Sequence, residues 1–74
     1  MFYVYLIRRY AKRSFYIGFT TDLKSRILQH REKYPTELIY YEAYCEEKLA
    51  RRREIKLKLY GSAWRGLKKR LSLA

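Results

Sequence analysis

The sequence has a single cysteine, Cys45, among its 74 residues. One cysteine excludes a disulfide framework within the chain and a zinc site built from several cysteines. Glu46 and Glu47 follow it directly, and negative neighbours disfavour the reactive thiolate form. We therefore interpret Cys45 as a structural thiol in a reducing compartment, and we expect a cytoplasmic protein.

Long apolar runs are also missing. Met1 to Ile7 is followed at once by Arg8 and Arg9, so this start is too short for a signal peptide, and no run approaches the ~20 residues of a membrane span. There is no repeat, low-complexity segment or linker. The length predicts a single domain over residues 1–74, which would bury only ~60% of its unfolded surface.

Acidic residues are scarce. The chain has 7 Asp and Glu against 18 Lys and Arg, for a net charge of +11. Such an excess opposes compaction and favours an anionic partner, of which nucleic acid is the plainest. No basic amphipathic helix with a wide apolar face stands out, so we expect no membrane partner.

Aromatic and β-branched residues are abundant. They gather in short stretches that predict strands, and segments typical of helices lie between and after these stretches. Composition and breaker residues predict strand, strand, helix, strand, helix, helix. The expected strands are Phe2–Ile7, Ser14–Phe19 and Glu37–Tyr44, and the expected helices run from the Thr20–Asp22 cap region to about Lys33, over Glu46–Tyr60 and over Ala63–Leu71.

Local signals set the expected helix ends. Pro35 ends the first helix, Gly61 stops the second, and Ser62 is the expected N-cap of the third. The expected buried stripe of the first helix consists of Leu23, Ile27, Leu28 and Tyr34.

The first two strands are expected to form a hairpin with a loop longer than two residues. If the hairpin centres between Tyr10 and Ala11, Tyr5 lies directly opposite Tyr16 on the same face. A slip by one residue would separate this pair.

Glu54 is the one acid among ten Lys and Arg between Lys48 and Ala74. Its helical neighbours Ala50 and Leu57 are apolar, which places its carboxylate near the inward stripe. A buried carboxylate needs a partner. One interpretation is an ion pair with Arg53, Lys58 or another arginine. The other is a magnesium ligand, because Mg²⁺ bound to phosphate often takes only one or two carboxylates.

Other polar residues also admit two interpretations. Tyr5 and Tyr16 are either half-buried sheet aromatics or phenols whose pKa positive surroundings lower, which would help one act as a base. Arg26 is a surface residue or a phosphate clamp, and His30, one helical turn later, is a solvent-facing or a functional side chain. Gly18 marks a bulge or a close approach of backbone to a ligand.

The remaining basic residues form either a solvated surface or contacts to a nucleic-acid backbone, and at this net charge we expect contacts. The expected contact residues are Arg13, Lys24, Lys58, Arg65, Lys68, Lys69 and Arg70.

Taken jointly, several stretches have a spacing that identifies a family. They are "YVY" (Tyr3 to Tyr5), "YIG" (Tyr16 to Gly18), "FTTDLKSRILQH", "LIYYEAY", "ARRREIKLK" and "YGSAWRGLKKRL". Over essentially the whole chain they resemble the GIY-YIG nuclease superfamily, in particular its small stand-alone bacterial members related to the excinuclease C amino-terminal domain.

The resemblance implies an α+β fold with a three-stranded, mostly antiparallel sheet flanked by three helices. It implies metal-dependent hydrolysis of phosphodiester bonds, most of all in DNA, in repair or recombination. It also implies roles for five residues: Tyr5 as general base, Tyr16 and Arg26 on water and phosphate, His30 in hydrogen bonding or proton transfer, and Glu54 on one Mg²⁺ or Mn²⁺.

The chain departs from the family pattern in three ways. Tyr3 stands where the first triplet has glycine, the sequence has no asparagine, and the loop between His30 and the third strand is short. Two other functions therefore stay open: a catalytically inactive nucleic-acid-binding module of the same fold, and an RNA-binding domain with exposed tyrosines as stacking platforms. A protein partner or homodimer also stays open.

Overall fold

The computed structural model describes residues 1–10 and 14–73. Arg13, which the sequence predicts to contact nucleic acid, lies outside the described residues.

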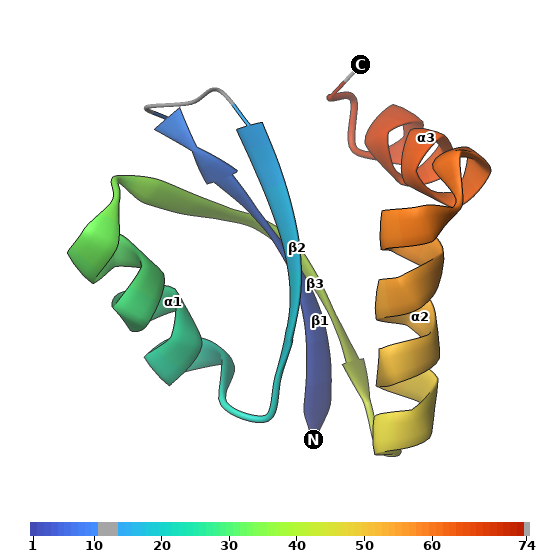
Figure 1. Cartoon of the computed structure of the whole chain (residues 1–74), viewed down its shortest axis with the longest axis horizontal. Coiled ribbons are helices and arrows are strands. Elements are labelled where there is room, and N and C mark those ends of the chain that lie inside the picture. Colours follow the sequence, from blue (N-terminus) through green and yellow to red (C-terminus); the bar gives the residue numbers. More distant parts are fainter. Residues whose placement is uncertain (11–13, 74) are drawn as a thin grey trace.

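The elements follow the order that the sequence predicts (Figure 1). Three strands and three helices alternate as β-β-α-β-α-α, so the predicted α+β class is confirmed. Their bounds are β1 Phe2–Arg9, β2 Ser14–Thr20, α1 Leu23–Lys33, β3 Thr36–Tyr44, α2 Glu47–Leu59 and α3 Gly61–Arg70.

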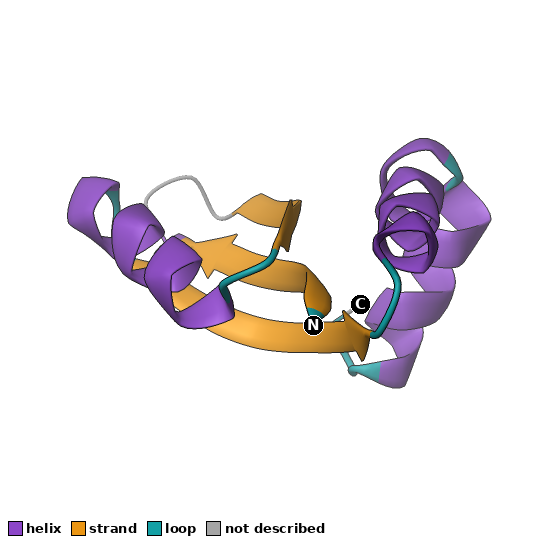
Figure 2. Cartoon of the chain, turned by 90° about the horizontal axis from the view of Figure 1, so that it is seen from below, coloured by secondary structure: helices purple, strands orange, loops and turns teal. Residues whose placement is uncertain are grey.

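The strands form one antiparallel sheet in the order β2-β1-β3, with β1 in the centre. Helix α1 covers one face, and α2 and α3 cover the other (Figures 1 and 2). Because side chains alternate along a strand, β1 supplies both layers of core. Val4 packs with Ala50 and Leu57 under α2 and α3, whereas Tyr5 and Ile7 pack under α1.

The register of the hairpin differs from the prediction by two residues. Tyr5 lies opposite Gly18, and Tyr16 lies opposite Ile7, so the expected direct pairing of Tyr5 with Tyr16 is wrong. A shift by two leaves every side chain on its face. The two tyrosines are therefore diagonal neighbours on the α1 side of the sheet, with ring centroids 6.3 Å apart.

The shift arises because β1 continues through two arginines that the sequence reading placed in the loop. Arg8 lies opposite Phe15 and its guanidinium carbon is 5.5 Å from that ring's centroid. Arg9 lies opposite Ser14, and its guanidinium carbon is 4.8 Å from the centroid of the Tyr16 ring. Cation–π stacking onto the neighbouring strand thus accommodates charged residues at the strand end.

Helix α1 begins where the sequence predicts, because the Asp22 carboxylate accepts a hydrogen bond from Ser25 N at 3.1 Å. The predicted buried stripe is only partly correct. Ile27 is buried, but Leu28 and Tyr34 are exposed. Tyr34 has already left the helix, since it is the extended C-cap ahead of Pro35.

The junction of α2 and α3 also differs from the prediction. Tyr60 has extended backbone angles and serves both as C-cap of α2 and as N-cap of α3. Its N–H donates to Lys56 O at 3.0 Å, and its carbonyl accepts from Ala63 N at 3.1 Å. Gly61 therefore begins the third helix rather than ending the second, and the predicted Ser62 cap is wrong. None of the helices within the described ranges is long and apolar enough to cross a membrane.

Candidate active site

Tyr5 is the central residue of the site. It lies in the middle strand with only 2% of its surface exposed. Its Oη is 2.9 Å from His30 Nε2 on α1, and the two rings meet edge to face at 5.7 Å. A strand and a helix 25 residues apart in sequence are thereby joined through two groups that can exchange a proton.

Because Gly18 has no side chain, it leaves room for the Tyr5 ring. A Cβ added to Gly18 would lie 2.8 Å from Tyr5 Cε1 and closer still to Cζ and Oη. No side chain larger than hydrogen fits in that space without moving the ring. The close approach that Gly18 allows in the folded chain is therefore that of the Tyr5 ring, and an approach of its backbone to nucleic acid stays a prediction.

Tyr16 extends the aromatic cluster to the edge of the sheet. Its ring centroid is 5.3 Å from that of His30 and 6.3 Å from that of Tyr5. From α2, Lys58 Nζ approaches the same ring to 5.8 Å. Tyr16 is partly exposed on the edge strand β2, so it connects the part-buried Tyr5–His30 pair with the surface.

Burial shifts the pKa of both Tyr5 and His30. It raises the pKa of Tyr5 to about 12, with a smaller upward contribution from Tyr16. Arg26 and Arg9 lower this pKa, but burial outweighs them. The prediction that positive surroundings would lower the phenol pKa is thus wrong for Tyr5.

The pKa of His30 shifts in the opposite direction, to a lower value. Burial lowers its pKa first, and the positive charges of Arg9, Arg26 and Lys33 lower it further. The imidazole is therefore neutral over a wider pH range than an exposed histidine. A neutral ring that carries its hydrogen on Nδ1 accepts the Tyr5 O–H at Nε2.

Arg26 lies one turn before His30 on α1, as predicted, and it is exposed. Its charge acts on both Tyr5 and His30. Within the described ranges it makes no ion pair, so its guanidinium remains available to an anion at the surface of the site.

Arg9 is a site residue that the sequence reading missed. Its guanidinium lies between two rings, with its central carbon 4.8 Å from the centroid of Tyr16 and 5.5 Å from that of Tyr34. Its buried Nε finds no hydrogen-bond partner in the part of the chain that the structure describes. The signal was the alternation of Tyr5, Ile7 and Arg9, which places all three on one face once β1 is extended.

Glu54 approaches the site from α2. Its side chain is only 14% exposed, and it is paired with Lys58 Nζ at 3.0 Å and with Arg51 at 4.0 Å. The predicted ion pair with Lys58 is confirmed. Arg53 is not the partner, since it binds Glu42 at 3.0 Å. The negative charge of Glu54 contributes to the raised pKa of Tyr5, so this carboxylate acts electrostatically on the Tyr5–His30 pair.

A divalent ion would find one protein carboxylate here. The described residues contain no group of three or more His, Cys, Asp or Glu side chains that could hold a metal. Glu54 alone fits an ion that takes most of its ligands from phosphate oxygens and water, as Mg²⁺ does in phosphoryl-transfer sites.

The other predicted contact residues divide between two sides of the sheet. Lys24 lies on α1, whereas Arg65, Lys68, Lys69 and Arg70 lie on α3, across the sheet from His30 (Figure 1). Two of the α3 side chains are engaged internally: Lys68 Nζ is 5.5 Å from the Trp64 ring, and Arg70 donates to Tyr40 Oη at 2.8 Å. The fold does not bring these four residues to the Tyr5–His30 pair.

A comparison with known protein families shows the family of this chain. The GIY-YIG catalytic domain matches residues 1–68. The chain belongs to this family. A GIY-YIG catalytic domain implies nuclease-type phosphodiester hydrolysis and a nucleic-acid substrate, and GIY-YIG nucleases typically use a divalent metal ion. No curated protein and no solved structure matches the chain.

Proposed function

We propose that this GIY-YIG protein is a metal-dependent endonuclease that cuts DNA, with Tyr5, Tyr16, Arg26, His30 and Glu54 as its catalytic residues. The observation that carries the proposal is the contact of 2.9 Å between Tyr5 Oη and His30 Nε2 beneath an exposed arginine and an edge-strand tyrosine. A buried phenol and a neutral imidazole in contact can move a proton away from an attacking water.

The proposed proton path follows from the two pKa shifts. A phenol whose pKa is raised to about 12 holds its proton too firmly to act as a base alone. The neutral Nε2 of His30 takes the Tyr5 hydroxyl proton while the Tyr5 oxygen takes one from water. The water oxygen then forms its bond to phosphorus, the bond from phosphorus to the leaving oxygen breaks, and His30 ends as imidazolium.

The remaining residues bind and orient the phosphate. Arg26 offers a planar guanidinium to the phosphate oxygens, and the partly exposed Tyr16 hydroxyl positions phosphate or water. Glu54 would hold the divalent ion, Mg²⁺ or Mn²⁺, which supplies Lewis-acid polarisation and stabilises the leaving oxygen when it is bound. Lys58 neutralises this carboxylate when no ion is present.

A second candidate is a catalytically inactive nucleic-acid-binding module of the same fold. The observation that favours it is the ion pair of Glu54 with Lys58, which engages the one candidate metal ligand. The narrower similarity to excinuclease C, a role in DNA repair or recombination and a cytoplasmic location are proposals that rest on the sequence alone.

The test is cleavage of labelled single-stranded, duplex and branched DNA with Mg²⁺, Mn²⁺ or EDTA. Wild type is compared with Glu54→Gln, and Glu47→Gln is the matched control because Glu47 is exposed on the same helix. We expect metal-dependent cutting that Glu54→Gln abolishes and Glu47→Gln retains. Tight, salt-sensitive binding without cutting under any metal would support the inactive module instead.

A further inference from the structure

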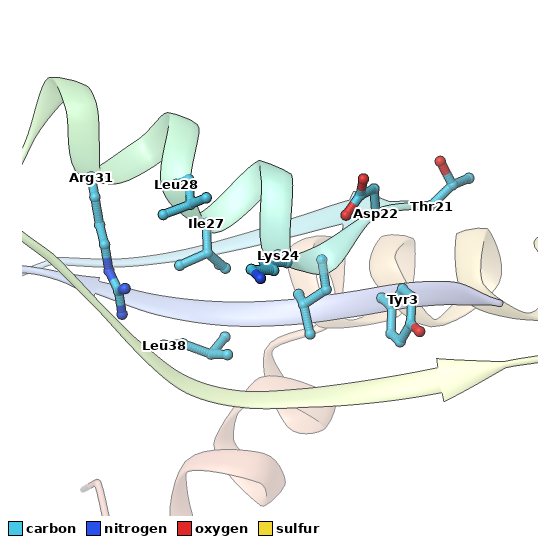
Figure 3. A pocket seen from close by; sticks show the side chains of 9 residues that line it. Tyr3, Thr21, Asp22, Lys24, Ile27, Leu28, Arg31 and Leu38 are labelled. Atoms are coloured by element: carbon cyan, nitrogen blue, oxygen red, sulfur yellow. The ribbon is translucent and has the colours of Figure 1, made fainter.

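A cavity opens beside α1, away from Arg26 and His30. It has a volume of about 550 Å³ and lies between α1 and the strands β1 and β3 (Figure 3). This volume falls in the range of about 300–1,000 Å³ that is typical of ligand sites. Tyr5, Tyr16, Arg26 and His30 do not line it.

The walls of this cavity are apolar and partly open to solvent. Ile27 and Leu28 point from α1 toward the sheet, and Leu38 faces them from β3 (Figure 3). Leu28 is 50% exposed, so the fold leaves one apolar wall unpartnered. A flat, apolar ligand in the cavity would therefore contact the part of the Leu28 side chain that the rest of the folded chain leaves uncovered.

Tyr3 supplies an aromatic side chain to one end of the cavity (Figure 3). Tyr3 lines it from β1 and meets Tyr41 of β3 edge to face, with ring centroids 6.0 Å apart. Tyr3 is also the residue that stands where the family's first triplet has glycine. This departure from the pattern gives the cavity an aromatic surface that glycine could not supply.

The rim of the cavity is positively charged. Lys24 and Arg31 line it from α1, and Arg31 Nε donates to Thr36 O at 3.4 Å, which holds the guanidinium across the gap to β3. Neither basic side chain forms an ion pair within residues 1–10 and 14–73. The acid at the rim, Asp22, is committed to the helix N-cap through Ser25.

We propose that this cavity binds an unpaired nucleobase of a nucleic-acid strand, with the base against Tyr3 and the strand's phosphates at Lys24 and Arg31. A nucleotide combines a flat apolar ring with an anionic group, which is the combination that this cavity complements. A second copy of the chain is the poorer occupant, because it would bring another +11 charge onto a basic rim. The proposal does not rest on hydrolysis, since the base can bind whether or not the chain cuts.

The proposal has a consequence for substrate choice. Helix α1 carries Arg26 and His30 toward one side and Lys24 and Arg31 toward the other, so both sites share one helix. A base in a duplex has its faces covered by its stacked neighbours, so it cannot lie against Tyr3 inside this cavity. The cavity therefore selects strands with at least one unstacked nucleotide beside the helix.

The test compares an oligothymidylate of roughly a dozen nucleotides with an abasic strand of the same length, by fluorescence anisotropy in EDTA. The two ligands have the same phosphates, so their difference isolates the base. We expect the full chain to prefer the oligothymidylate by about ten-fold or more, as one stacked base typically provides.

Two variants place the preference in the cavity. Tyr3→Leu keeps an apolar side chain but removes the ring, and Leu28→Gln removes an exposed apolar wall. Both are expected to lose most of the preference for bases while keeping wild-type affinity for the abasic strand. Leu59→Gln is the control, because Leu59 is 74% exposed on α2 and lies outside the cavity. Circular dichroism melting checks that each variant is folded.

Three results would overturn the proposal. Equal binding of the two strands by wild type would show that no base is bound. A preference that survives both cavity variants would place the base elsewhere. A dimer in sedimentation experiments that Leu28→Gln disperses would identify a second copy of the chain as the occupant.

Discussion

Tyr5 and His30 are each held in a protonation state that suits proton transfer between them. Burial raises the pKa of Tyr5 and lowers that of His30, so both are neutral near pH 7 and share one hydrogen bond. Arg9 and Arg26 add positive charge to the same space. One of two interpretations of the sequence was that positive surroundings lower the pKa of the tyrosines, whereas for Tyr5 burial outweighs the positive charges and raises the pKa.

This environment can be measured directly, because His30 is the one histidine in the chain and gives a single ring Hε1 signal in NMR. We expect its pKa to lie below the ordinary value of about 6.5. Arg9→Met removes a positive charge that opposes protonation, so the pKa should rise toward 6.5. Arg52→Met removes an equal charge from the exposed side of α2 and should leave it unchanged.

The sign of the pH effect on folding follows from the same shift. Folding disfavours charged His30, so stability is fully present above about pH 6.5 and declines as the pH falls through the lowered pKa. Arg9→Met should weaken this decline. An Arg9→Met titration midpoint equal to or below that of wild type would contradict the electrostatic role of Arg9.

Gly18 provides a second test at a single position. In Gly18→Ala the added methyl would overlap the Tyr5 ring, and such overpacking typically costs about 1–3 kcal/mol. Gly66→Ala is the matched control, since a Cβ at Gly66 meets nothing within 4 Å in helix α3. It should be neutral or stabilise by about 0.5–1 kcal/mol.

Denaturant unfolding measures both changes, and the Tyr5–His30 contact gives a further readout. If Gly18→Ala displaces the phenol, the His30 pKa should also change, whereas Gly66→Ala should leave it as in wild type. Equal stabilities of the two variants would show that the space beside Gly18 is not needed for Tyr5.

Helix α2 places Glu54 and Lys58 one turn apart, and this spacing predicts competition between lysine and metal. Lys58 Nζ lies 3.0 Å from the carboxylate that we propose as the metal ligand. Lys58→Met should therefore tighten Mn²⁺ binding by about fivefold, or ~1 kcal/mol, as expected for a partly exposed ion pair. Lys56→Met removes the same charge from an exposed position of the same helix and should have little effect.

The free Mn²⁺ signal in electron paramagnetic resonance measures this binding to the complex of the protein with DNA, whether or not the DNA is cut. Weaker binding in Lys58→Met than in wild type would contradict the proposed place of the metal at Glu54.

The elements were more predictable than their contacts. Strand composition, the Asp22 cap and Pro35 identified the three strands and α1, because these signals act within a few residues. The segments of α2 and α3 were also identified, but the Gly61 and Ser62 signals misplaced the junction between them. The hairpin register was not predictable in the same way. It depends on Arg8 and Arg9 stacking on Phe15 and Tyr16 of the next strand, which no local pattern reveals.

In the candidate site, too, the residues were predictable from the sequence but their contacts were not. Family spacing identified Tyr5, Tyr16, Arg26, His30 and Glu54 as candidates, and the fold places the first four around one hydrogen bond. The pKa of Tyr5 depends on burial in the central strand, and the partners of Glu54 depend on which arginines reach it. Both are tertiary properties, so the sequence overestimated the effect of net charge on Tyr5 and left the partner of Glu54 open between Arg53, Lys58 and another arginine, of which Lys58 and Arg51 pair with it.

Across the whole molecule, the basic residues are more widely distributed than the proposed catalytic residues. The chain has a net charge of +11, and its helices carry lysines and arginines on both faces of the sheet (Figures 1 and 2). In contrast, Tyr5, Tyr16 and His30 form one cluster, with ring centroids 5.3–6.3 Å apart. Backbone binding through many lysines and arginines is sequence-independent and salt-dependent. Loss of one catalytic oxygen should therefore stop cutting without releasing the DNA.

The most direct measurement is single-turnover cleavage of labelled DNA by wild type and Tyr5→Phe, with binding affinity determined on the same samples in EDTA. Phenylalanine keeps the ring beside Gly18 and removes only the oxygen that contacts His30. The account predicts a loss of cleavage rate of about 10²–10⁴-fold, the usual contribution of a general base, with unchanged affinity. A Tyr5→Phe protein that cuts at the wild-type rate would contradict it.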